Sequence, residues 1–161
     1  MSTPAAGADL PPEVIEAFTS SAVTALHELA QLEAIPANSA AIGTTIAGDV
    51  VVAVVQLLRS IPGAMTLVLP PVLAQRLSEG YLPGGTELTD EIINDVAGEL
   101  ANVIAGQAKT ILKGTPYHFK LSIPAVSRRA GCGQLPGVAI TLVVETTLLQ
   151  LLVDLGPCPG A

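Results

Sequence analysis

The stretch that decides the fold is TDEIINDVAGELANVIAGQAKTILK, residues 89–113, which has the longest helical pattern in the chain. Its apolar residues recur at spacings of three and four, as in a helix that buries one face. Thr86 or Thr89 is placed to cap the first turn. Gly114 and Pro116 end the pattern, because glycine accepts the left-handed conformation and proline cannot continue a helix. The sequence therefore predicts one long amphipathic helix here.

A narrow polar stripe runs along the exposed side of this helix. At about 100° per residue, the residues within roughly 40° of Asp95 are Glu91, Asp95, Glu99, Asn102, Gly106 and Lys109. Glu99 and Asn102, three apart, are direct neighbours on the stripe, and Asp95 lies one turn before Glu99. Most stripes of this kind are solvated helix faces, so the stripe alone is a weak indication of a functional site.

The segments on either side of the long helix alternate between helix and strand patterns. Helices are expected over 13–33 and from Pro70-Pro71 through Leu82. Runs rich in β-branched residues predict strands over 40–48, 50–58, 64–70, 117–127, 137–147 and 148–156. A buried helix over 50–59 is the competing interpretation of one run, which lacks clean alternation. Residues 34–39 are expected to form a loop and 128–137 a mobile loop.

This order of elements predicts an α+β fold, with a mixed β-sheet of about six strands packed against two or three helices, one of them long. The 161 residues suit one domain. We assign residues 13–161 to that domain and expect residues 1–12 to be a disordered tail.

Composition excludes several classes of function. A net charge of −7 has the wrong sign for a protein that binds nucleic acid. No apolar run reaches the length of a membrane span, and the first residues do not resemble a secretory signal, so we expect a cytoplasmic protein. Cys132 and Cys158 are too few for a disulfide framework or a metal site, and no metal site is predicted.

The segment DVAGELANVIAGQAKT, residues 95–110, resembles the CheC/CheX/FliY family of chemotaxis phosphatases. The motif of that family is Asp or Ser, three residues, Glu, two residues, Asn and, about 22 residues later, Pro. The matching residues here are Asp95, Glu99, Asn102 and Pro124, with 21 residues between the last two. An E-x-x-N pair alone is common in helices, whereas the combined spacing is considerably more specific.

The resemblance covers about residues 13–155 and is greatest to the single-site members named CheX. The first helix offers only Glu28-x-x-Gln31, in which Gln replaces Asn, so we predict no second site there. CheX proteins dimerise through exchanged strands, which implies a possible homodimer. The apolar C-terminal strands, 137–155, are the expected pairing surface.

The resemblance implies hydrolysis of the phospho-aspartate of a CheY-like receiver domain. Asn102 would orient the attacking water, and Glu99 would pair with the active-site Lys of the receiver. Asp95 would be a secondary anchor or capping contact, and Pro124 would shape the segment beneath the helix. The receiver brings its own divalent metal, Mg²⁺, so this chain is expected to need no cofactor of its own.

Gly98, next to Glu99, is a further candidate for a contact residue. Glycine within a helix costs roughly 1 kcal/mol of helix stability relative to alanine. This cost suggests that another chain approaches closely at Gly98. The alternative is that the helix tolerates a weak position here.

Two other functions of the domain remain open. The domain could dock on a response regulator or flagellar switch component without hydrolysis, or it could be a structural, oligomer-forming domain.

Overall fold

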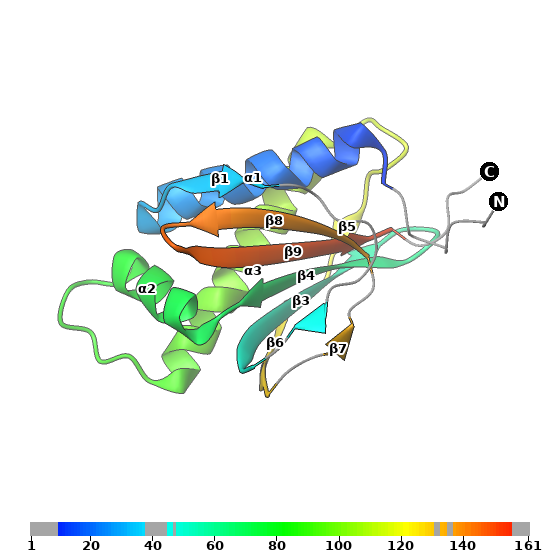
Figure 1. The fold of residues 1–161 in the computed structure, drawn as a ribbon. Helices are drawn as coiled ribbons and strands as arrows, with labels where there is room; N and C mark the ends of the chain where they lie inside the picture. The colour runs from blue at the N-terminus through cyan, green and yellow to red at the C-terminus, as the bar shows by residue number, and fades with distance from the viewer. Residues whose placement is uncertain (1–9, 38–44, 47, 131–132, 135–136, 156–161) are drawn as a thin grey trace.

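The structure is a computed structural model that describes residues 10–37, 45–46, 48–130, 133–134 and 137–155. Most of the predicted tail, most of the predicted strand 40–48 and part of the predicted loop 128–137 lie outside these residues. Figure 1 shows α1 and α3 behind the strands and α2 at one end of them. The fold is α+β, as predicted from the sequence.

Three helices occur in the described part of the chain: α1 (Pro12–Ala30), α2 (Pro71–Tyr81) and α3 (Asp90–Ile111). The long helix α3 begins directly after Thr89, whose Oγ1 accepts a hydrogen bond from the N–H of Ile92 at 3.2 Å. Thr89 is thus the cap, and Thr86 is not. Gly114 has a φ of 85°, the left-handed conformation expected after the helix.

The strands are β1 (Ala34–Pro36), β2 (Thr45–Ile46), β3 (Val50–Leu58), β4 (Gly63–Leu69), β5 (Lys120–Leu121), β6 (Ala125–Arg129), β7 (Gly133–Gln134), β8 (Val138–Val144) and β9 (Thr147–Asp154). The main sheet has seven strands in the order β1-β8-β9-β4-β3-β5, and β6 also pairs with β3. β2 and β7 form a separate pair. Every pairing in the described residues is antiparallel, so the expectation of a mixed sheet is corrected.

The competing helix over 50–59 was wrong, because these residues form β3. Val51, Ala53 and Val55 are buried in the main core beneath the helices. Val50 and Val52 are buried in a second apolar cluster on the opposite face of the sheet. A strand buried on both faces has no polar side to alternate with its apolar side, and this is why the run VVVAVVQLL lacks alternation.

Three further predictions are corrected by the pairing of the strands. The expected loop 34–39 contains β1, whose three residues are too few to show a period. The expected single strand 117–127 is two strands, β5 and β6, separated by Ser122–Pro124. The expected loop 128–137 includes the end of β6 and the whole of β7.

The C-terminal strands lie inside the main sheet. β8 pairs with β1 and β9, and β9 pairs with β8 and β4. In the single chain both neighbours of each of these strands belong to the same chain, so homodimer pairing through 137–155 would require the exchange of strands that the resemblance implies.

The main core lies between one face of this sheet and the three helices. Leu100 and Ile104, on the buried side of α3, are part of this core. Phe18 of α1 stacks on Phe119 with ring centroids 5.9 Å apart. No helix in the described ranges has the length and apolar character that a membrane crossing requires. The buried side of α3 leaves its opposite, polar side at the surface.

Candidate functional site

A groove of about 970 Å³ lies between α3 and the chain that leads from β5 into β6. Its lining residues are Glu91, Asn94, Asp95, Gly98, Glu99, Asn102, Leu121, Ser122, Ile123, Pro124 and Val126. All five candidate residues from the sequence, Asp95, Gly98, Glu99, Asn102 and Pro124, are among them. The structure thus brings the helical motif and the distant proline to the two walls of one groove.

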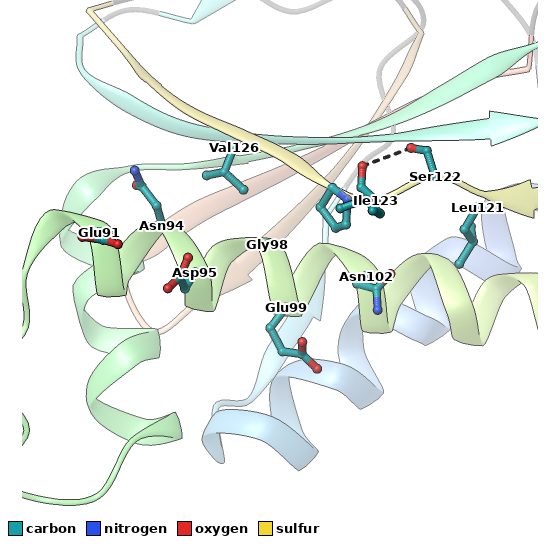
Figure 2. A pocket seen from close by; sticks show the side chains of 11 residues that line it. Glu91, Asn94, Asp95, Gly98, Glu99, Asn102, Leu121, Ser122, Ile123 and Val126 are labelled. Carbon is teal, nitrogen blue, oxygen red and sulfur yellow. Dashed lines mark hydrogen bonds between the residues drawn. The ribbon is translucent and has the colours of Figure 1, made fainter.

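The polar stripe of α3 forms one wall. Glu91, Asp95, Glu99 and Asn102 are exposed, while Gly106 and Lys109 farther along the stripe are partly covered. Figure 2 shows Asp95, Glu99 and Asn102 along the front of the helix and the other wall above it. Asp95 lies six residues after the cap Thr89, so it does not cap the helix.

Glu99 also lies beside a small gap where the three helices meet, next to Leu29 of α1 and Tyr81 of α2, and this gap is too small to admit water. In Figure 2 the side chain of Glu99 extends away from the segment that carries Ser122 and Ile123. Its carboxylate is therefore exposed to solvent beside the groove, where a partner can contact it.

Gly98 is buried beneath the other wall of the groove. A Cβ atom at this position would lie 3.1 Å from Cγ2 of Val126 and 3.9 Å from Cβ of Pro124. The expectation that another chain approaches Gly98 is thus corrected: the close neighbour belongs to this chain's own β6 and the residue before it. The missing side chain allows the wall of the groove to pack directly on the helix.

The second wall is held to β3 by hydrogen bonds. The N–H of Gln56 donates to Oγ of Ser122 at 2.8 Å, and the N–H of Ser122 donates to the C=O of Gln56 at 3.1 Å. The hydroxyl of Ser122 donates in turn to the C=O of Ile123 at 3.2 Å, drawn as a dashed line in Figure 2. An ion pair of 3.4 Å between Arg128 and Asp90 joins β6 to the first turn of α3.

The sequence did not identify five of the residues that line the groove besides the stripe: Asn94, Leu121, Ser122, Ile123 and Val126. Asn94 could have been identified as a candidate from the sequence, because it is a polar residue at the edge of the apolar face of α3. Its Oδ1 is buried and has no hydrogen-bond partner among the described residues. The four others belong to the second wall, and only the pairing of β5 and β6 with β3 brings them to the helix.

The groove is acidic and offers a free carboxamide. Glu91, Asp95 and Glu99 supply carboxylates, and none of the described residues that line it is basic. Among the described residues that line it, one carries a hydroxyl, Ser122, and this hydroxyl is already engaged in hydrogen bonds. A carboxamide such as that of Asn102 can both donate to and accept from a water molecule. This arrangement suits the positioning of water and a cationic partner group better than nucleophilic attack by a side chain.

The first helix does not reproduce this arrangement. α1 ends at Ala30, and Gln31 follows it with a left-handed φ of 57°. Glu28 and Gln31 therefore do not lie one turn apart on a helix face. The absence of a second site at Glu28-x-x-Gln31 stays a prediction.

Residues 51–140, more than half of the chain, match the sequence model of the family described as "Chemotaxis phosphatase CheX". Among solved structures, chemotaxis protein CheX from Desulfovibrio desulfuricans has a TM-score of 0.78 and 21% identity, covering 89% of this chain and 99% of that one. The CheX-CheY-BeF3-Mg complex from Borrelia burgdorferi has a TM-score of 0.68 and 18% identity, covering 88% and 96%.

Thermotoga maritima FliY has a TM-score of 0.65 and 19% identity, covering 90% of this chain and 91% of that one. At these identities the likeness to solved structures shows the fold alone. The search of curated proteins found no match to this chain.

Proposed function

Since this chain belongs to the CheX family of chemotaxis phosphatases, we propose that it hydrolyses the phospho-aspartate of a CheY-like response-regulator receiver domain. The observation that carries the proposal is the position of Glu99 and Asn102. Both are exposed, one turn apart on α3, at the groove whose other wall contains Pro124. The solved CheX-CheY-BeF3-Mg complex of a structural neighbour supports a receiver as the partner.

Asn102 is proposed to orient the attacking water. Hydrolysis of an acyl phosphate adds water at phosphorus and breaks its bond to the aspartate oxygen, which releases inorganic phosphate and restores the carboxylate. Catalysis of such a transfer depends mainly on in-line positioning and on stabilisation of charge. The carboxamide of Asn102 has the donor and the acceptor needed to hold a water in one orientation.

Glu99 is proposed to set the docking register by pairing with the active-site Lys of the receiver. Asp95, one turn before it, is a second carboxylate on the same exposed stripe and is proposed as an additional anchor. A groove lined by three carboxylates and no basic residue among those described is complementary to such a cation. The receiver would supply the divalent metal, Mg²⁺, which this chain is not required to bind.

Pro124 and Gly98 are proposed to shape the groove without touching the reacting atoms. Pro124 lies directly before β6, and Gly98 allows Val126 of β6 to approach α3. Together they set the spacing between the two walls.

The decisive experiment is the decay of a phosphorylated CheY-like receiver, measured alone and with wild-type protein, Asn102→Ala or Gln75→Ala. Gln75 is an exposed carboxamide on α2 that does not line the groove, so it is the matched control. We expect wild type and Gln75→Ala to accelerate decay equally. Loss of the water-orienting group should lower turnover by Asn102→Ala by roughly 10²-fold or more, with binding retained.

Glu99→Gln separates docking from turnover in the same assay. This variant keeps the shape of the side chain and removes its charge, so we expect a raised KM for the receiver with a smaller effect on kcat. Equal decay in all samples, with a receiver shown to bind, would instead leave a non-catalytic docking module. A receiver that neither binds nor decays faster would favour the structural, oligomer-forming domain.

A further inference from the structure

The segment between β5 and β6 is a β-bulge at the edge of the main sheet. Leu121 is the partner of Leu57 on β3, and Ala125 is the partner of Val54. Three residues, Ser122, Ile123 and Pro124, therefore lie opposite two residues of β3. An extra residue bends a strand and changes the direction in which its side chains are presented, and bulges occur often beside active sites.

The bulge presents Ile123 to solvent. The side chain of Ile123 is 89% exposed, the highest value among the exposed large apolar residues in the described part of the chain. Ile123 lines the same groove as Glu99 and Asn102. In Figure 2 it lies above the stretch of α3 between Gly98 and Asn102.

The backbone on both sides of Ile123 is held in place. Ser122 exchanges two hydrogen bonds with Gln56 of β3 and makes a third to the C=O of Ile123. Pro124 restricts Ile123 to extended conformations, because the proline ring disfavours the helical region for the preceding residue. A backbone held in this way loses little conformational entropy when a partner covers its apolar side chain, so binding at this point is favoured.

We infer that Ile123 is an apolar docking anchor for the phosphorylated receiver, which seats the receiver over Glu99 and Asn102. This inference rests on the proposed function. The acidic groove selects the same occupant, because a Lys-bearing active site complements its three carboxylates. Burial of an apolar residue beside a charged pair excludes water from that pair, as in the centre of many interfaces.

The test is a titration with a CheY-like receiver bearing BeF3 and Mg²⁺, a mimic of the phosphorylated state, so that binding is measured without turnover. Wild type is compared with Ile123→Ser, Ile123→Leu and Ile35→Ser. Ile35 is the matched control: it is 65% exposed and lies on β1, at the opposite edge of the main sheet. Unchanged thermal unfolding of each variant would verify that the fold is retained.

We expect Ile123→Ser to raise the dissociation constant by about tenfold or more, since the apolar surface it would bury is lost. Ile123→Leu and Ile35→Ser should bind within about twofold of wild type. In the decay assay the loss should appear mainly as a raised KM of Ile123→Ser for the phosphorylated receiver, because the residue contributes to docking.

Two results would overturn the inference: equal binding by Ile123→Ser and wild type, whatever the effect on kcat, or an equal loss of binding with Ile35→Ser. If wild type binds the receiver but does not accelerate decay, only the proposed hydrolysis fails, and the titration still decides the role of Ile123. If wild type does not bind the receiver, both proposals fail.

Discussion

Single residues of α3 differ in what surrounds them, and the two glycines of the helix show this most directly. Gly98 is buried under Val126, and an added Cβ would lie 3.1 Å from its Cγ2. At Gly106 the nearest atom to an added Cβ is Cδ1 of Leu121 at 4.0 Å, an ordinary contact. The same residue type therefore has a packing role at one position of the helix and none at the other.

We predict opposite effects of substitution at these two glycines. Gly106→Ala should raise the free energy of unfolding by up to about 1 kcal/mol, the usual gain in helix propensity. Gly98→Leu should lower it by about 1–3 kcal/mol, because the larger side chain must displace β6 or distort α3. Urea denaturation of both variants measures the difference. Equal stability of Gly98→Leu and wild type would show that β6 does not rest on the helix at this point.

At the scale of elements, the candidate site depends on one helix and one bulged strand edge. α3 presents Glu99 and Asn102, and the bulge between β5 and β6 supplies Ile123 and Pro124. The ion pair between Asp90 and Arg128 links the two elements near the start of α3. Because it is largely exposed, we assign it less than about 1 kcal/mol. The start of α3 is held mainly by its cap and by the buried side of the helix.

The cap of α3 can be tested with its two threonine candidates. Thr89→Ala should lower the free energy of unfolding by about 1 kcal/mol, because the N–H of Ile92 loses its acceptor. Thr86→Ala is the control, since Thr86 donates only to the C=O of Pro83 in the preceding turn. Chemical denaturation of both variants gives the comparison. A larger loss for Thr86→Ala than for Thr89→Ala would contradict the assignment of the cap.

At the scale of the whole molecule, the main core helps to position the second wall of the groove. Phe119, directly before β5, is buried and stacks on Phe18 of α1. This contact fixes the start of the segment that forms the second wall of the groove. The second wall is therefore positioned by two sets of contacts: the packing of Phe119 in the core and the pairing of β5 and β6 with β3.

We predict that Phe119→Ala lowers the free energy of unfolding by about 3–5 kcal/mol, the range for loss of a buried phenylalanine. His118→Ala, at the exposed neighbouring position, should change it by less than about 0.5 kcal/mol. Thermal or urea unfolding distinguishes the two. A small effect of Phe119→Ala would mean that the ring is not packed in the core.

The homodimer predicted from the sequence stays a prediction. Strands 137–155 are interior to the sheet, so pairing through them requires the exchange of strands between two chains. Sedimentation at several protein concentrations measures the oligomeric state.

The sequence by itself determined the features that depend on local order. The period of α3, its stop at Gly114 and the neighbouring positions of Glu99 and Asn102 follow from the spacing of residues along one helix. The α+β class and most of the longer elements followed in the same way. These predictions succeeded because hydrophobic period and turn residues act over a few positions.

Only the tertiary structure decided where the rest of the site lies. The groove exists because the chain after α3 returns to pair with β3, and the bulge at Ser122–Pro124 exists because that pairing is offset by one residue. Gly98 was assigned to an outside partner because its true neighbour, Val126, is close in space but not in sequence. The antiparallel sheet and the burial of β3 on both faces are likewise non-local, since they arise from partners that no short window of sequence contains.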